Sequence, residues 1–172
     1  MEAYYIYIDE FKKTHTKDFL NSYADIKLNL EKRFFEYTIG RYLVKTVAKQ
    51  KYEIEDTEII LNEKSKPIFK NADLYFNISH SKNIVIACFD KNPCGIDIEY
   101  MKTRDLPKFS NYYSQKFNTQ EDFYKFWTYK EASYKLQEEV CGKYITKFQD
   151  DYYLAIVSNQ KFDIQNAIHP FI

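Results

Sequence analysis

The sequence predicts an α+β protein made of two related halves, each combining a long helix with a small antiparallel sheet. A predicted helix followed by short β-rich runs occurs twice along the 172 residues, although the two occurrences share no residue-level repeat. The chain has only 3 glycines and 4 prolines, which leaves little material for flexible linkers. We therefore expect one compact unit, with an N-terminal half at residues 1–98 and a C-terminal half at residues 99–172.

The first half is predicted to contain a strand, a long helix and a second, short strand. The run AYYIYI at residues 3–8 is rich in aromatic and β-branched residues, which favour strands. A helix is predicted from about residue 29 to residue 50, because apolar side chains recur at every fourth position: Phe35, Ile39, Leu43 and Val47. A strand at about residues 58–61 then leads into the turn NEKSKP.

The middle of the chain is predicted to be sheet, and a second helix follows it. The runs LYFNIS, NIVIACF and GIDIE are separated by turn residues, and because consecutive strands often pair, we expect an antiparallel meander. A helix is predicted over residues 119–137, with one side formed by aromatic residues: Phe123, Phe126, Trp127 and Tyr134. The run YYLAIVS predicts one more strand, followed by a weak C-terminal segment.

The charge of the whole chain is balanced, with 25 basic and 25 acidic residues, so the composition favours neither a nucleic-acid nor a membrane partner. Residues 27–52 nevertheless carry a local excess of positive charge. Two acids, Glu31 and Glu36, stand there against seven basic residues: Lys27, Lys32, Arg33, Arg41, Lys45, Lys49 and Lys51. We expect this segment to form a basic surface that meets phosphate or carboxylate groups.

The three cysteines, Cys88, Cys94 and Cys141, are odd in number and lack CxxC spacing, which argues against a disulfide framework and a structural zinc site. The longest apolar run, IVIACF, is short and the N-terminal run MEAYYIYIDEF carries acids, so neither a transmembrane span nor a signal peptide is predicted. A cytoplasmic protein is expected. We also expect a monomer, since two halves can build one site within one molecule.

Two carboxylates in the run CGIDIEYMK, Asp97 and Glu99, are expected on one face of a strand, because side chains two residues apart project to the same side. One interpretation is a pair of charges on the solvated face of an antiparallel strand. The other is a divalent cation, since Mg²⁺, or Mn²⁺ in its place, prefers oxygen ligands and typically takes one or two carboxylates together with substrate phosphates. The run PCGIDIEY contains no Lys or Arg that would offset the repulsion between the acids.

Glu131 and Lys135, in FWTYKEASYK, are an acid and a base four residues apart on one helix face. Alone, such a pair is a common stabilising feature of helices. If the helix brings Glu131 to the acid pair at residues 97 and 99, three carboxylates surround one metal ion.

Two further polar segments differ in their chemistry: one suits phosphate binding, although a histidine there is more often structural, and the other is most simply an exposed polar turn. In FNISHS, Ser79 and His80 offer a hydroxyl and an imidazole in a predicted turn. In NEKSKPIF, Lys64 and Lys66 lie in a turn closed by Pro67.

The order of these blocks resembles the motif series of the 4′-phosphopantetheinyl transferases, in particular the surfactin-synthetase-activating type, which includes many holo-acyl-carrier-protein synthases. The blocks are SKP, FNISHS with NIVIACF, GIDIE and FWTYKEASYK. The pairing of GIDIE with the later WxxKEAxxK is the specific part. The resemblance implies that family's fold, and transfer of the phosphopantetheine arm of coenzyme A to a serine of an apo acyl carrier protein or a peptidyl or polyketide carrier domain, with release of 3′,5′-ADP.

The resemblance also implies residue roles. Mg²⁺ would be held by Asp97, Glu99 and Glu131. Catalysis would rest on Asp97, Glu131 and Lys135, with the serine proton passing to Glu131 or to a metal-bound water. The phosphates of coenzyme A would be bound by Lys66, Ser79, His80 and Lys135. The basic helix would meet the 3′-phosphate of coenzyme A and steer an acidic carrier through Lys32, Arg33 and Arg41.

Two departures from the family pattern are visible, and two other functions stay open. Ser65 stands where the turn usually has glycine, and only 37 residues follow Lys135, so the second half is predicted to be shortened. The first alternative is a Mg²⁺-dependent phosphohydrolase or nucleotidyl transferase that uses the same carboxylates. The second is a coenzyme A or carrier-protein binding module with weak or no catalysis.

Overall fold

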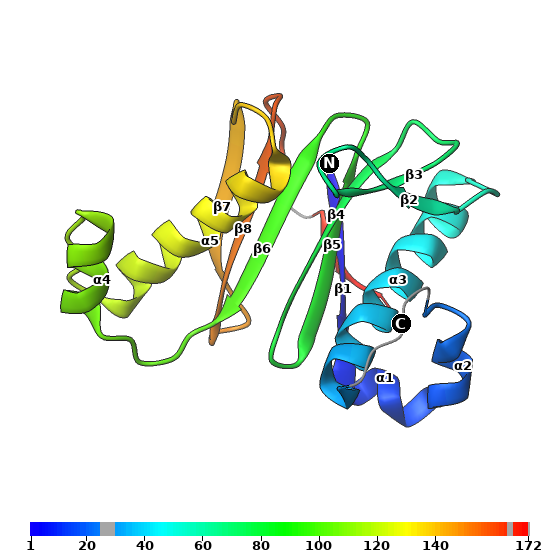
Figure 1. The fold of residues 1–172 in the computed structure, drawn as a ribbon, viewed down its shortest axis with the longest axis horizontal. Helices are drawn as coiled ribbons and strands as arrows, with labels where there is room; N and C mark the ends of the chain where they lie inside the picture. The colour runs from blue at the N-terminus through cyan, green and yellow to red at the C-terminus, as the bar shows by residue number, and fades with distance from the viewer. Residues whose placement is uncertain (25–29, 165–166, 172) are drawn as a thin grey trace.

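The fold is mixed α+β, as predicted, and its main elements form four layers. The structure is a computed structural model in which residues 1–24, 30–164 and 167–171 are described. Two sheets pack against each other. Helix α3 (Glu31–Tyr52) covers the outer face of one sheet, and helix α5 (Gln120–Leu136) covers the outer face of the other (Figure 1). The shorter helices are α1 (Ile8–Thr14), α2 (Lys17–Asn21) and α4 (Leu106–Tyr113).

The first sheet has the strand order β4-β5-β1-β9. Its strands are β4 (Tyr75–Ser81), β5 (Ile84–Asp90), β1 (Glu2–Tyr7) and β9 (Ile168–Pro170). Neighbours pair antiparallel, except that β9 runs parallel to β1. The predicted opening strand is thus confirmed, and β9 lies in the weak C-terminal segment. A separate two-stranded sheet is formed by β2 (Ile59–Leu61) and β3 (Pro67–Phe69).

The second sheet is antiparallel, with the order β6-β8-β7. Its strands are β6 (Cys94–Tyr100), β8 (Tyr152–Ser158) and β7 (Gly142–Phe148). The predicted meander is therefore wrong in one respect, because β4 pairs with β5 but β6 pairs with β8. The reason is burial: in the second sheet, β6 has the first sheet against one face and α5 against the other, so both faces are covered.

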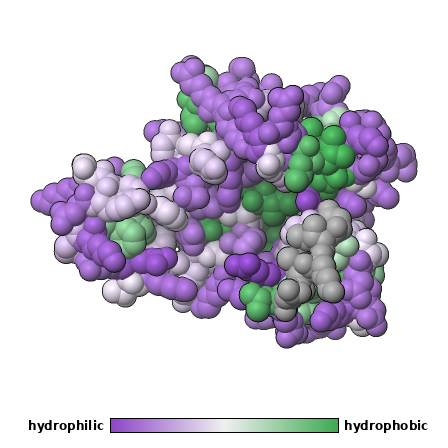
Figure 2. Space-filling view, viewed as in Figure 1, coloured by the Kyte–Doolittle hydropathy of each residue, from purple (hydrophilic) through white to green (hydrophobic). Residues whose placement is uncertain are grey.

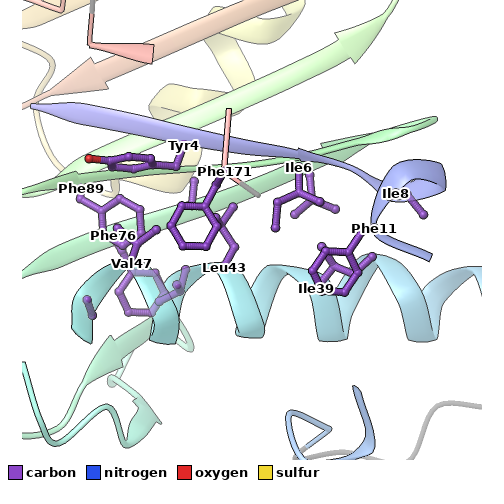
Figure 3. Packing of buried hydrophobic residues seen from close by; sticks show 14 of the residues in the cluster. Tyr4, Ile6, Ile8, Phe11, Ile39, Leu43, Val47, Phe76, Phe89 and Phe171 are labelled. Carbon is purple, nitrogen blue, oxygen red and sulfur yellow. The ribbon is translucent and has the colours of Figure 1, made fainter. Parts of the chain in front are cut away.

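A hydrophobic core lies between α3 and the first sheet (Figure 3). The four residues whose spacing predicts this helix are all buried: Phe35, Ile39, Leu43 and Val47. From the sheet, Tyr4, Phe76 and Phe89 pack against them. The long-helix prediction is confirmed. Its first predicted residue, Asn29, and the basic residue Lys27 lie outside the described residues.

Helix α5 is confirmed close to its predicted bounds. The Thr119 side chain accepts a hydrogen bond from the backbone N–H of Asp122, and the Asp122 side chain bonds back to the Thr119 backbone, which fixes the start of the helix. The prediction that Tyr134 shares the buried aromatic side is wrong, because its side chain is 77% exposed. Residue 134 lies two positions from buried Ala132, about 200° around the helix, and so faces solvent.

The surface in this view is mostly hydrophilic, with a hydrophobic patch over β2 and β3 (Figure 2), where Ile60 and Leu61 are exposed. Across the described parts of the chain, every helix is too short or too polar to cross a lipid bilayer.

Candidate active site

The acid pair of β6 faces helix α5. Ile96 and Ile98 are buried between the two sheets, whereas Asp97 and Glu99 project from the opposite face of the strand and bond to α5 side chains. The expectation that both acids share a face is confirmed. They are not solvated charges on an open strand, because the Asp97 side chain is only 7% exposed and Glu99 is partly buried.

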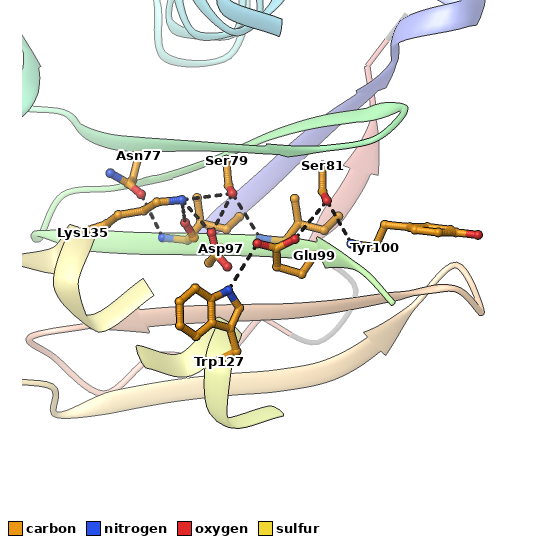
Figure 4. Close-up of polar contacts among 10 residues, drawn as sticks. Asn77, Ser79, Ser81, Asp97, Glu99, Tyr100, Trp127 and Lys135 are labelled. Atoms are coloured by element: carbon orange, nitrogen blue, oxygen red, sulfur yellow. Dashed lines mark hydrogen bonds and ion pairs between the residues drawn. The ribbon is translucent and has the colours of Figure 1, made fainter. Parts of the chain in front are cut away.

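Asp97 forms an ion pair with Lys135 of α5, at 2.7 Å between Oδ1 and Nζ. The Lys135 ammonium also donates to Ser79 Oγ at 3.0 Å and to the Ile96 carbonyl at 3.1 Å. The Ser79 hydroxyl donates to Asp97 Oδ1 at 2.9 Å (Figure 4). The other carboxylate oxygen, Asp97 Oδ2, is buried and has no hydrogen-bond partner among the described residues.

Glu99 is held by two neutral donors. Trp127 Nε1 donates to Oε1 at 3.3 Å, and Ser81 Oγ donates to Oε2 at 3.2 Å (Figure 4). Burial raises the pKa of Glu99, and the negative charge of Asp97 raises it further. The charged form of Glu99 is therefore disfavoured where no cation balances the two acids.

Glu131 lies on the same face of α5 as Trp127 and Lys135, four residues from each, which places it between the two side chains that reach β6. It makes no hydrogen bond to Asp97 or Glu99. In the described ranges, no three His, Cys, Asp or Glu side chains are already gathered as a metal site.

The acid pair nevertheless fits a hard divalent cation. A buried carboxylate oxygen without a donor and a neighbouring carboxyl with a raised pKa are both stabilised by a positive ion beside them. All of the candidate donor atoms are carboxylate oxygens, the ligand type that Mg²⁺ prefers.

Three residues predicted to bind phosphate line one pocket of about 370 Å³: Arg33, Arg41 and His80. Glu36 also lines it, and its Oε1 lies 3.7 Å from His80 Nδ1 and 3.5 Å from Lys32 Nζ. Partial burial lowers the pKa of His80. The negative charge of Glu36 opposes this shift, whereas the positive charges of Lys135 and Lys32 add to it. The pocket thus lies between helix α3 and strand β4, which supply most of the residues that line it.

The prediction that Ser79 and His80 lie in a turn is wrong. Both are inside β4, which ends at Ser81, and as neighbours in a strand they project to opposite faces. Ser79 joins the Asp97–Lys135 contact, whereas His80 faces the α3 pocket. Strand β4 thus contributes to the Asp97–Lys135 contact from one face and to the α3 pocket from the other.

Lys66 is buried and directed at the protein main chain. Its ammonium donates to the Cys94 carbonyl at 3.0 Å and to the Leu136 carbonyl at 3.4 Å. Burial lowers the pKa of Lys66. It therefore ties the predicted phosphate-binding turn to the start of β6 and the last residue of α5, and does not line the pocket of Arg33 and His80.

Three residues that contact β6 lie outside the sequence-based assignment: Asn77, Ser81 and Trp127. The spacing of two between Asn77, Ser79 and Ser81 in a predicted strand is a signal that could have identified the first two, because it places three polar side chains on one face. The sequence predicts Trp127 only as a buried aromatic residue of the helix. Its indole N–H could be assigned to Glu99 only from the structure.

Comparison with known proteins finds several transferases of one kind. The chain is 30% identical over 155 residues to the 4′-phosphopantetheinyl transferase ffp of Bacillus subtilis, covering 78% of this chain and 69% of the relative. It is 29% identical over 155 residues to the 4′-phosphopantetheinyl transferase Sfp of Bacillus subtilis (strain 168), with the same coverage of 78% and 69%. The 4′-phosphopantetheinyl transferase gsp of Aneurinibacillus migulanus is 30% identical over 125 residues, covering 66% of this chain and 50% of the relative. No family model matches.

The similarity extends over most of the chain and most of the first relatives, well beyond the short motifs of β4, β6 and α5. The structure brings those motifs together, since side chains of all three elements bond to one another around Asp97 and Glu99. By sequence, the chain thus belongs to the Sfp-type 4′-phosphopantetheinyl transferases and is a transferase of that class.

Proposed function

We propose that the protein transfers the 4′-phosphopantetheine arm of coenzyme A to a serine of an apo acyl carrier protein, or of a peptidyl or polyketide carrier domain, in a Mg²⁺-dependent reaction. The observation that carries the proposal is the contact of β6 with α5, which brings Asp97, Glu99 and Lys135 together. It occurs in a chain whose relatives are named 4′-phosphopantetheinyl transferases. Mn²⁺ is an alternative ion for the same oxygen ligands.

The transfer is a substitution at phosphorus. The serine oxygen of the carrier attacks the phosphorus nearest the pantetheine arm, and a new O–P bond forms. The bond from that phosphorus to the bridging oxygen breaks, and its electron pair leaves with 3′,5′-ADP. The serine proton passes to Glu131, the one carboxylate of the three that makes no hydrogen bond within the described chain, whereas Asp97 and Glu99 are already hydrogen-bonded.

The remaining roles follow from charge. Lys135 stabilises negative charge on the reacting phosphate and the leaving oxygen. Asp97, Glu99 and Glu131 would hold the divalent cation, which supplies positive charge to the pyrophosphate when bound. Ser79 holds Asp97 and Lys135 in position. The phosphates of coenzyme A are bound in the α3 pocket by the guanidinium groups of Arg33 and Arg41 and by a hydrogen bond from the His80 imidazole.

Each sheet carries its own long helix, and we propose that the two halves, residues 1–98 and 99–172, are related by pseudo-symmetry with the second half shortened. Strand β6 crosses the proposed boundary and is anchored on both sides. This arrangement would place coenzyme A between halves of one molecule.

The test is the mass of the carrier. The protein is incubated with coenzyme A, Mg²⁺ and an apo carrier, and a gain of one phosphopantetheine arm supports the proposal. Lys135→Met and Glu131→Gln should lower the rate at least about 100-fold. Lys130→Met is the matched control, because Lys130 lies on the same helix but is exposed and stacks on Tyr113. Carriers of all three kinds that stay unmodified would favour a binding module, and turnover of coenzyme A without a carrier would favour a phosphohydrolase.

A further inference from the structure

Strand β4 holds strand β6 through side chains. The two strands belong to different sheets and are not paired through their backbones. Instead, three side chains of β4 accept hydrogen bonds from backbone N–H groups of β6 at 3.0, 3.2 and 2.9 Å, and the three pairs are Asn77 with Ile96, Ser79 with Ile98 and Ser81 with Tyr100. Each pair is 19 residues apart in sequence, so the strands run in the same direction. We call Asn77, Ser79 and Ser81 the polar ladder, and each of these residues with its hydrogen bond to a β6 N–H group is one rung.

Two rungs of the polar ladder also hold an acid. The Ser79 hydroxyl accepts from Ile98 N–H and donates to Asp97, and the Ser81 hydroxyl accepts from Tyr100 N–H and donates to Glu99 (Figure 4). Each serine therefore fixes the backbone of β6 and the carboxylate of the preceding residue at the same time.

The third rung lacks the second bond. Asn77 accepts from Ile96 N–H, but the residue before Ile96 is Gly95, which has no side chain. Asn77 therefore holds only the backbone of β6, whereas Ser79 and Ser81 each hold the backbone and an acid.

We propose that Ser81 is a positioning residue for Glu99, and that the polar ladder lets one sheet orient the acid pair carried by the other. This inference rests on the proposed function, because it assigns the acids their use. A hydroxyl that both donates and accepts leaves its carboxylate few orientations, and side chains that orient metal ligands typically affect metal affinity strongly.

The experiment compares Ser81→Ala, Ser81→Thr and Asn77→Ala. Mn²⁺ is titrated into the protein with coenzyme A present and free Mn²⁺ is followed by electron paramagnetic resonance, which needs no turnover. We expect Ser81→Ala to weaken Mn²⁺ binding about 10-fold or more and to lower kcat while the KM for the carrier stays near the wild-type value. Ser81→Thr, which keeps the hydroxyl, should restore both.

Asn77→Ala is the matched control for loss of a backbone rung. Amide hydrogen exchange should become faster at Ile96 in this variant and at Tyr100 in Ser81→Ala, and the free energy of unfolding should fall in both. Mn²⁺ affinity should stay at the wild-type value in Asn77→Ala. If that variant proves unfolded, Asn77→Leu, which lacks the acceptor but fills a similar volume, takes its place.

The inference is wrong if Ser81→Ala binds Mn²⁺ and turns over like the wild type, or if Asn77→Ala loses as much Mn²⁺ affinity as Ser81→Ala. In either case the polar ladder joins the sheets without orienting the acids. A wild-type protein that charges no carrier refutes the proposed function itself, so the two failures are separate results.

Discussion

The ion pair between Asp97 and Lys135 is largely shielded from water, with side-chain exposures of 7% and 27%. Removing one partner of a shielded pair leaves the other charge without compensation. Lys135→Met should therefore lower the free energy of unfolding by about 3 kcal/mol. In the double variant Asp97→Asn/Lys135→Met no charge is left uncompensated, so most of that loss should be recovered, whereas carrier modification should stay absent. Urea unfolding of the four proteins of this cycle measures the effect, and a double variant as unstable as Lys135→Met would contradict it.

Glu99 should make the free energy of unfolding depend on pH. Burial, and then the charge of Asp97, raise the pKa of Glu99 above its ordinary value of 4.5. A carboxyl whose pKa is raised by folding stabilises the fold most at low pH, and this contribution is lost as the pH rises from 4.5 through the raised pKa. Glu99→Gln is neutral at every pH, so it should be more stable than the wild type at neutral pH and should lose that advantage in acid.

The measurement is thermal unfolding of the wild type and of Glu99→Gln from acid to neutral pH. A chelator is present, so that no divalent cation stabilises the wild type. The difference between the two curves isolates Glu99 from the other titrating groups. A variant that is less stable than the wild type at neutral pH would show that the hydrogen bonds from Trp127 and Ser81 outweigh the burial of the charge.

At the scale of elements, the approach of β6 to α5 depends on Gly95. A Cβ atom at this position would collide with the backbone carbonyl of Ala132 and would lie 2.8 Å from the Leu136 nitrogen. Gly95→Ala should therefore push α5 away from β6 and lower the free energy of unfolding by about 1–3 kcal/mol, with loss of transfer activity.

Gly40→Ala is the control for Gly95→Ala. Its Cβ would lie 3.2 Å from Ile78 Cγ2, a side-chain atom that can shift, and alanine favours helix in the middle of α3. Denaturant unfolding should place Gly40→Ala within about 1 kcal/mol of the wild type. Equal losses at the two glycines would contradict the special closeness of β6 and α5.

Lys66 connects three elements, and its replacement tests that connection. Lys66→Met should leave the Cys94 and Leu136 carbonyls without this donor and lower the free energy of unfolding by about 1–3 kcal/mol, with the KM for coenzyme A unchanged. Lys64→Met is the control, because Lys64 is exposed and its Nζ donates a hydrogen bond at the surface, to the Gln137 carbonyl at 3.3 Å. A raised KM without a loss of stability would instead support the predicted phosphate contact of Lys66.

The elements that could be predicted from sequence are those with a local cause. The four-residue spacing of α3 and the Thr119 cap of α5 are properties of neighbouring residues, and so is the shared face of Asp97 and Glu99. The pairing of β6 with β8 joins residues more than fifty positions apart and depends on which faces become covered. No local pattern contains that information.

The residues of the site also divide into those that the sequence predicts and those that only the structure reveals. The resemblance to a family points to Lys135 and Asp97, and the structure joins them in an ion pair. The polar ladder could not be recognised without knowing that β4 lies beside β6, because strands of different sheets do not follow the rules of backbone pairing. Adjacency in sequence groups Ser79 with His80, but the two side chains project to opposite faces of strand β4.

Positive charge is distributed unevenly over the whole molecule. The net charge is zero, but residues 27–52 carry an excess of basic residues. Lys32 and Arg33 are exposed at the start of α3, beside the pocket assigned to coenzyme A. If they steer an acidic carrier, kcat/KM for the carrier should fall as the ionic strength rises from about 0.05 M to about 0.5 M, because the screening length shortens.

Lys32→Gln should reduce both kcat/KM and its dependence on salt. Lys51→Gln, at the other end of α3 and about 28 Å away along the helix axis, should leave both unchanged because that distance exceeds the screening length. Stopped reactions at several salt concentrations give the slopes. Identical slopes for the wild type and Lys32→Gln would show that the carrier docks elsewhere.

During synthesis of the chain, one edge of the first sheet stays unpaired until strand β9 has been made. The first sheet begins with residues 2–7, yet in the described structure the outer edge of β1 pairs with residues 168–170, which are synthesised after the whole second sheet. While the ribosome is still adding the later residues, that edge exposes unpaired backbone groups to other nascent chains. This edge of β1 is therefore protected from such misassociation only after residues 168–170 have been synthesised and have paired with it.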